Sequence, residues 1–375
     1  MKKGLRVLHL VAIRGKGGTG ASTASLVEGL AKRGHRVFLV CFSRSAIYQR
    51  ARTVPGVEVI TGIYMSPLRR LGRLARDLAR LSQVVRREGI ELIHTHSSPD
   101  TWLGFFLSIL FPKVPLVRSR HVPVSLSSNP FNGVIHQRLK GVVAVSHSVK
   151  ASYLKGKCWQ DKVVVIQDGV ETERFSPLEK GKPFREEIGL EEGLLILNVS
   201  RYAPVKGLQI FLEGVAPVLK RHANAKAVVV GRKREELLPV LEEHAKVIGI
   251  EKDVLFLEHR PDIPRLMGAA DLLVLSSVGS EGSSRVALEA HSSGRPMVGT
   301  RVGAIPEVID HLHTGVVVPP YDPPAITKAT LALMENRRLA KRTGMLARRR
   351  ALHRMRREGT VDKTEALYGR ILGEG

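Results

Sequence analysis

Two glutamates, Glu281 and Glu289, lie in the segment SEGSSRVALEAH with seven residues between them. The spacing alone indicates little, because other glutamate pairs share it: Glu171 and Glu179, Glu179 and Glu187, Glu235 and Glu243, Glu243 and Glu251. The setting is more informative, since an apolar run at 271–275 is followed by a glycine-containing loop and then by a helical pattern. A strand, a turn and a helix N-terminus in this order present backbone N–H groups to a phosphate. Ionised carboxylates are strong acceptors for vicinal hydroxyls, so we expect Glu289 to bind a ribose and Glu281 a second polyol such as a hexose.

The start of this helix is expected near Arg285, with Ser283 or Ser284 as the N-cap. The unpaired N–H groups of the first turn, together with the helix dipole, suit a phosphate.

A second basic loop, NVSRYAPVKG, follows the apolar run 194–199 and carries Arg201 and Lys206. Arginine supplies a planar bidentate donor and lysine a mobile point charge, and together they would neutralise a departing diphosphate. A generic basic loop is the alternative in so basic a chain. The position of the loop favours the diphosphate-binding role, because this loop and the Glu281 loop both follow strands of the same half of the chain.

The N-terminal segment RGKGGTGAS, with Gly17 and Gly18, also lies between a predicted strand and a predicted helix. It superficially resembles the variant phosphate loop of ParA- and MinD-type ATPases, but Ala21 stands where that loop needs a lysine. We therefore expect backbone N–H contacts to substrate or diphosphate, or a tight turn that binds no ligand, rather than nucleotide hydrolysis.

Three histidines lie at the C-terminal ends of predicted strands. His94 and His96 share one face of a strand end, but no third metal ligand is apparent nearby, so packing and backbone hydrogen bonds are the favoured roles. His121 either hydrogen-bonds a sugar hydroxyl or is a solvated loop histidine.

Strand-like runs alternate with helical patterns along most of the chain, which predicts parallel sheets with right-handed crossovers. Strands are expected at 6–13, 36–41, 58–61, 92–94, 116–118, 141–145, 163–166, 194–199, 227–230, 254–257, 272–275, 297–299 and 316–318. Each half holds about six, so the fold class is α/β with two doubly wound Rossmann-like domains. The charged, proline-containing segment 171–193 is the expected boundary region.

The 375 residues carry 59 Lys and Arg against 35 Asp and Glu, a net charge of +24, which indicates an anionic partner. Nucleic acid is disfavoured, because aromatic residues make up only 5% and do not alternate with basic ones. Helical patterns at 68–88 and 337–357 have basic faces that are either solvated or rest on anionic lipid. The longest apolar run, 101–111, is too short to span a bilayer, and two distant cysteines predict neither a disulfide nor a zinc site.

Taken in order, these segments resemble the retaining, GT-B fold glycosyltransferases of glycosyltransferase family 4, of the type that builds bacterial cell-surface glycans. The resemblance covers nearly the whole chain and rests on IHTHSS, VVAVSHSVK, VVVIQDGVETERF, SRYAPVKG and, most specifically, EGSSRVALEAHSSGRPMVGTRVGAIPEVI. It implies an acceptor-binding N-terminal domain at 1–178 joined by a C-terminal helix at 360–375, a donor-binding domain at 190–355, and a cleft between them. Three positions depart from the family pattern: Ser283 is usually bulky or aromatic, Arg285 is usually smaller or apolar, and Asp168 replaces an asparagine.

The resemblance also implies the roles of individual residues. Arg201 and Lys206 would bind the donor diphosphate, and Glu281 and His121 would lie at the transferred sugar. Together these four form the expected catalytic set. The remaining donor contacts are expected from Gly282, Ser283, Ser284, Arg285, Val286 and Glu289.

We therefore predict a metal-independent enzyme that moves a sugar from a UDP-, GDP- or ADP-sugar to a glycan or glycolipid hydroxyl with retention, in lipopolysaccharide or other envelope glycan synthesis. No Asp-x-Asp pair is present to hold a divalent ion, and no cofactor is expected. The departing phosphate oxygen would take the acceptor's proton. The expected location is the cytoplasm, at the inner face of the cytoplasmic membrane if the basic surface binds lipid. The alternatives are a GT-B sugar-nucleotide epimerase and, from another class, a MinD-like nucleotide switch that binds membranes.

Overall fold

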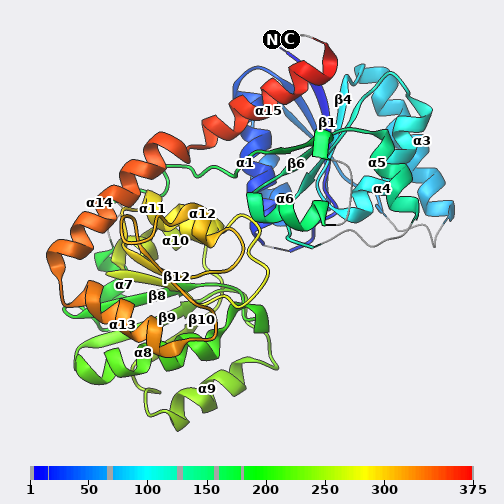
Figure 1. Ribbon diagram of the computed structural model, residues 1–375. Coiled ribbons are helices and arrows are strands. Elements are labelled where there is room, and N and C mark those ends of the chain that lie inside the picture. Colours follow the sequence, from blue (N-terminus) through cyan, green and yellow to red (C-terminus); the bar gives the residue numbers. More distant parts are fainter. Residues whose placement is uncertain are drawn as a thin grey trace. The chain divides into compact units, whose positions relative to one another are not determined.

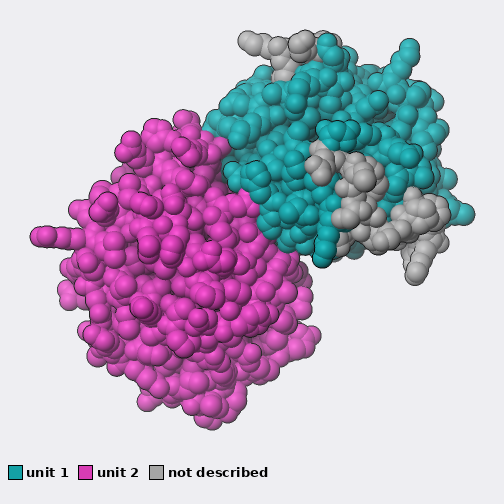
Figure 2. All heavy atoms as spheres, viewed as in Figure 1, with its two compact units in different colours: residues 1–169, 357–375 teal, residues 170–356 magenta. Residues whose placement is uncertain are grey.

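The computed structural model describes residues 4–15, 17–65, 71–124, 130–155, 160–178 and 181–373. The chain forms two compact units (Figures 1 and 2), and unit 1 combines residues 1–169 with residues 357–375. Unit 2 is the continuous segment 170–356. The expected boundary at 171–193 is therefore corrected: this segment belongs to unit 2, where Val170, Phe175 and Phe184 are buried in the core.

Unit 1 is built on a seven-stranded sheet in the order β3-β2-β1-β4-β5-β6-β7, and every neighbouring pair is parallel. The strands are β1 Arg6–Leu10, β2 Arg36–Val40, β3 Val57–Ile60, β4 Leu92–Thr95, β5 Leu116–Arg120, β6 Leu139–Ala144 and β7 Val163–Val165. Because side chains alternate across a strand, β1 buries Val7 on one face and Leu8 on the other.

Helices cover both faces of this sheet. One face packs against α1 (Gly18–Lys32), α2 (Ala46–Ala51) and the C-terminal helix α15 (Arg357–Leu372). The opposite face packs against α3 (Leu71–Glu88), α4 (Ser98–Leu110), α5 (Pro130–Arg138) and α6 (His147–Leu154). Helices α1 and α15, from opposite ends of the chain, lie side by side (Figure 1). The expected return of the C-terminal helix to the N-terminal half is confirmed, and the helix starts three residues earlier than expected.

Unit 2 holds a six-stranded parallel sheet in the order β10-β9-β8-β11-β12-β13. The strands are β8 Leu194–Val199, β9 Ala225–Val230, β10 Val254–Leu257, β11 Leu272–Leu275, β12 Met297–Thr300 and β13 Val316–Val318. These match the expected strands closely, because buried parallel strands are apolar runs that stand out in the sequence.

Two helical layers enclose this second sheet (Figure 1). The helices on one face are α8 (Leu208–Arg221), α9 (Leu238–Val247) and α13 (Pro323–Met334). The helices on the other face are α7 (Lys182–Glu187), α10 (Ile263–Ala269), α11 (Arg285–Ser292) and α12 (Ile305–Val308). The long basic helix α14 (Arg337–Arg354) packs against α11 and α13. None of the helices in the described part of the chain is long and apolar enough to cross a membrane.

Candidate functional site

The two loops singled out in the second half of the sequence lie next to each other in unit 2. Strands β8 and β11 are parallel neighbours, so the segments that follow them leave the same edge of the sheet. The N–H of Val278 donates to the carbonyl of Val205 over 2.9 Å, and the Ser276 hydroxyl donates to the carbonyl of Lys206 over 3.0 Å. Gly207 joins the first loop to α8. Its backbone lies in the left-handed region, with φ of +58°, and a Cβ added there would lie 2.3 Å from the Ser276 carbonyl oxygen. Only glycine fits this approach.

Lys206 and Glu281 connect the two loops directly. The Lys206 Nζ forms an ion pair with Glu281 Oε1, and the Ser277 hydroxyl donates to the same oxygen over 2.5 Å. Only 16% of the lysine side chain and 11% of the glutamate side chain are exposed. Partial burial strengthens such a pair and leaves each charge costly without the other. The ammonium is thus held at the sheet edge, where an anion can share it.

The helix expected near Arg285 begins there, as α11. Ser284 takes the N-cap position with φ of +49°, but its side chain makes no capping hydrogen bond. The Ser284 hydroxyl is buried and has no hydrogen-bond partner in the described part of the chain. The expected capping by a serine hydroxyl is therefore corrected, because the left-handed backbone conformation of Ser284 differs from the extended one that lets an N-cap side chain reach the first turn. Without that cap, the first N–H groups of α11 are available to an anion.

Glu289 lies one turn inside α11 beside Arg285. The Arg285 Nη2 donates to Glu289 Oε1 over 3.3 Å, an ion pair between residues four apart on the helix. Burial raises the pKa of the Glu289 carboxyl, and the positive charges of Arg285 and Arg174 oppose that rise. Arg285, which departs from the family pattern, is thus paired with Glu289, the carboxylate that is predicted to bind the ribose.

The other predicted donor residues lie on the same segments. Gly282, Ser283 and Val286 are partly exposed between and beside the two glutamates. Arg201 is exposed after β8, and its guanidinium makes no hydrogen bond or ion pair with any residue that the structure describes.

The N-terminal loop of unit 1 is seen in part. Gly17 is the N-cap of α1 and Gly18 its first residue, both exposed, while Lys16 lies outside the described residues. Gly17 has φ of −94°, and nothing lies within 4 Å of an added Cβ. Its conformation therefore does not require glycine.

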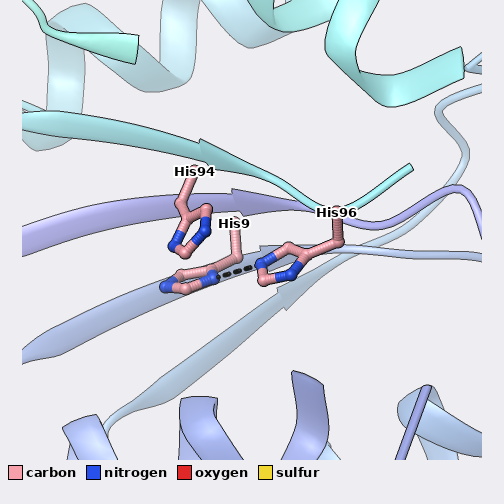
Figure 3. A group of neighbouring side chains, drawn as sticks. All are labelled: His9, His94 and His96. Carbon is pink, nitrogen blue, oxygen red and sulfur yellow. Dashed lines mark hydrogen bonds between the residues drawn. The ribbon is translucent and has the colours of Figure 1, made fainter. Parts of the chain in front are cut away.

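The two strand-end histidines meet a third that was not expected. His9 of β1 pairs in register with His94 of β4, and one nitrogen from each of His9, His94 and His96 lies within 4.8 Å of the others (Figure 3). The expectation that no third ligand lies nearby is wrong, because the sheet order β1-β4 joins positions 85 residues apart. The feature of the sequence that could have indicated this third histidine is the position of His9 inside the first apolar run.

Existing hydrogen bonds already occupy most of this cluster. His94 Nδ1 lies 2.6 Å from the Tyr368 hydroxyl and His94 Nε2 lies 2.8 Å from the Ser119 hydroxyl. His9 Nδ1 shares a hydrogen bond of 3.0 Å with His96 Nε2 (Figure 3). Burial lowers the pKa of all three imidazoles, that of His9 to about 3, so they are neutral near pH 7. A metal ion at these nitrogens would have to replace the hydrogen bonds, and the arrangement fits a buried network of neutral imidazoles better.

His121 extends this network. Its Nε2 lies 3.4 Å from His96 Nδ1, and burial lowers its pKa although the negative charge of Asp168 opposes the shift. Both His121 and Asp168 line a hollow of about 20 Å³, roughly the space of one water molecule. The Ser22 hydroxyl donates to Asp168 Oδ2 over 2.5 Å at its wall. Asp168, noted in the sequence only because it replaces the family's asparagine, is therefore part of this polar site.

Both units of the chain match family models of known enzymes. Residues 16–174 match the family model for Glycosyltransferase Family 4, and residues 193–336 match that for Glycosyl transferases group 1. The chain belongs to glycosyltransferase family 4. It has the GT-B fold and is a glycosyltransferase.

Individual relatives span nearly the whole chain. N-acetyl-alpha-D-glucosaminyl L-malate synthase of Bacillus anthracis is 26% identical over 375 residues, covering 95% of this chain and 94% of that protein. A glycosyltransferase from Rickettsia africae superposes with a TM-score of 0.89 at 20% identity, with complete coverage of both chains. HepE of Anabaena, solved in complex with UDP-glucose, gives a TM-score of 0.82 at 22% identity, covering 97% of this chain and 99% of that one. WaaG, a glycosyltransferase involved in lipopolysaccharide biosynthesis, gives a TM-score of 0.72 at 17% identity, covering 96% of this chain and all of that one.

Proposed function

We propose that this glycosyltransferase moves a sugar from a nucleotide-sugar to a hydroxyl acceptor with retention of anomeric configuration. The observation that carries the proposal is the Lys206–Glu281 ion pair, which brings a cation and a polyol-binding carboxylate together at one sheet edge. The Anabaena protein that shares the fold binds UDP-glucose. We extend that class of donor, a UDP-, GDP- or ADP-sugar, to this chain.

The donor diphosphate is assigned to Lys206, Arg201 and the start of α11. Lys206 is partly buried and is held by Glu281. Arg201 is exposed and makes no hydrogen bond or ion pair with the other described residues. The loop therefore carries one fixed cation and one that can adapt its position to the ligand. The first N–H groups of α11 add the positive end of the helix dipole. These groups supply electrostatic stabilisation of the departing diphosphate, and we propose that no metal ion is needed for it.

The two carboxylates divide the sugar contacts. Glu289 accepts hydrogen bonds from the ribose hydroxyls. Glu281 orients the transferred sugar, and Lys206 and Ser277 hold the Glu281 carboxylate in place. The diphosphate oxygen released from the donor takes the acceptor proton as the acceptor attacks from the same face. For His121 we propose a neutral hydrogen-bonding role toward a substrate hydroxyl, in keeping with its lowered pKa.

The acceptor is assigned to bacterial envelope glycans, with lipopolysaccharide intermediates as the leading class. This assignment rests on the family resemblance, on the lipopolysaccharide role of WaaG and on the net charge of +24, which suits phosphorylated or membrane-borne acceptors. Cytoplasmic action at an anionic membrane surface follows from the same argument.

A thermal-shift panel with UDP, GDP, ADP and their sugars tests the donor assignment. A ligand at about 100 times its dissociation constant stabilises the folded state by roughly 2.7 kcal/mol, so the matching nucleotide raises the Tm while the others do not. Absence of a shift with every nucleotide would contradict the assignment. Chromatography of the products then separates transfer to an acceptor from epimerisation of the donor, which the alternative enzyme class predicts.

A further inference from the structure

A second, strongly basic hollow lies in unit 2, outside the proposed donor site. Its volume is about 420 Å³, and its walls are the loop at 310–314 and the C-terminal half of α14. No residue of the donor set lines it. A hollow of this size falls in the range of small-molecule sites rather than of sites for a bare ion.

One face of α14 supplies most of the charge. Leu346, Arg349, Arg350, His353 and Arg354 line the hollow, and their spacing of three and four residues places all of them on the same side of the helix. The other wall contributes His313 and one carboxylate, Asp310. Three guanidinium groups therefore face a single acidic side chain.

These arginines are not neutralised within the protein. Arg349 and Arg354 make no side-chain hydrogen bond or ion pair with any residue in the described ranges. Arg350 donates from Nη2 to the carbonyl oxygen of Glu307 over 3.4 Å, while its buried Nε has no partner in the described part of the chain. Arg348, on the neighbouring side of α14, shows the contrast, because its Nη1 donates to backbone oxygens of Thr172, Phe175 and Ser292.

The helix dipole explains only part of this pattern. Cations in the last turn of a helix are favourable, which accounts for Arg354. Arg349 and Arg350 lie further from the helix end. Arg350 is also four residues from Arg354, and like charges at this spacing on a helix repel each other. An anion in the hollow would relieve that repulsion.

The facing loop is fixed by its own hydrogen bonds. The Thr314 hydroxyl accepts from the N–H of Asp310 over 2.9 Å and lies 2.9 Å from His291 Nε2 on α11. The N–H of Leu312 donates to the carbonyl of Gly315 over 2.7 Å. The wall is therefore preformed, which lowers the entropic cost of binding.

We propose that this hollow binds a phosphate monoester, carried by a small molecule or by a lipid headgroup. A planar guanidinium group can donate two parallel hydrogen bonds to two oxygens of a phosphate. Three such groups suit the two negative charges of a phosphate monoester better than the one charge of a carboxylate ligand. Leu346 offers an apolar contact to the part of the ligand that carries the phosphate.

The test compares the full-length chain with two charge-matched variants. Arg349→Gln with Arg354→Gln removes two charges from the hollow, whereas Arg337→Gln with Arg338→Gln removes two exposed charges from the other end of α14. Calorimetry with sn-glycerol 3-phosphate at 150 mM salt measures the soluble ligand, with glycerol as the uncharged control. Co-sedimentation with phosphatidylcholine vesicles, with and without phosphatidic acid, measures the headgroup.

The hollow variant should lose about tenfold or more in affinity for the phosphate-bearing probe, because two guanidinium groups that donate charge-assisted hydrogen bonds to the phosphate are removed. The helix-end control should change less than about twofold. Loss confined to glycerol phosphate identifies a soluble ligand, and loss confined to phosphatidic acid vesicles identifies a lipid headgroup. No binding of either probe, or equal loss in both variants, would overturn the proposal. Unchanged far-UV circular dichroism shows that the variants fold.

Discussion

Lys206 Nζ and Glu281 Oε1 form an ion pair that ties the loop after β8 to the loop after β11. The two residues are 75 positions apart, and the parallel pairing of β8 with β11 brings their loops together. In the absence of a donor, the carboxylate neutralises the lysine, and the Ser277 hydroxyl supports the same oxygen. A bound diphosphate would share the ammonium with Glu281, so donor binding and the internal charge balance of the site are linked.

Lys206→Ala should lower the free energy of unfolding by about 1–3 kcal/mol, because it leaves the partly buried Glu281 carboxylate without its cation. Urea unfolding measures the loss. In the double variant with Glu281→Ala part of the stability should return, since neither charge is then left alone. Additive losses in the double variant would show that the pair makes no net contribution.

Gly207→Ala should destabilise the protein by about 1–3 kcal/mol, because it combines a left-handed φ with a Cβ 2.3 Å from the Ser276 carbonyl oxygen. Gly17→Ala is the control, at a negative φ and in open space, and should cost only about 0.5–1 kcal/mol, the loss expected when alanine replaces glycine at an N-cap. Thermal unfolding of both variants checks this. Equal changes in Tm would contradict the geometry assigned to Gly207.

Glu289→Gln should flatten the dependence of stability on pH. The folded-state pKa of Glu289 is raised, so just above pH 4.5 the folded state holds more protons than the unfolded state, and this residue lowers stability as the pH rises. Glutamine carries no such charge. Urea unfolding between pH 5 and 7 should therefore show that the free energy of unfolding of the variant rises relative to that of the wild type as the pH increases. Parallel plots of this free energy against pH for the two proteins would refute the raised pKa of Glu289.

His9→Asn should reduce the loss of stability in acid. Burial lowers the folded-state pKa of His9 to about 3, so between pH 6.5 and that value the unfolded state binds a proton that the folded state excludes. The wild type therefore loses stability as the pH falls through this interval. Unfolding at pH 7, 5.5 and 4.5 measures the difference, and an unchanged acid slope in the variant would count against a neutral, buried His9.

The sequence predicts the sheets well and the side-chain partnerships less well. The strands of unit 2 are short apolar runs whose bounds are almost all as expected, because burial on both faces leaves few polar residues inside them. The contact between His9 and His94 depends instead on the order of strands in the sheet, which no local pattern encodes. The link between Arg285 and Glu289 is different, since their spacing of four residues on a predicted helix already places them together.

Two further features required the fold. The basic stripe on α14 has a helical spacing that is visible in the sequence, but the hollow exists only because the loop at 310–314 faces it. The sequence marks Asp168 only as a replacement of the family's asparagine. Its place beside His121 follows because the strands β5 and β7 end at the same edge of the sheet.

The most direct test of the account is calorimetric titration of the wild type, Glu289→Ala and Glu243→Ala with UDP, or with whichever nucleotide the thermal-shift panel selects. Glu243 belongs to a glutamate pair with the same spacing as Glu281 and Glu289, but it is exposed on α9. Loss of the ribose contacts should weaken binding by about tenfold or more in Glu289→Ala, while Glu243→Ala should bind like the wild type. Wild-type affinity in Glu289→Ala would contradict the proposal that the α11 segment binds the donor nucleotide.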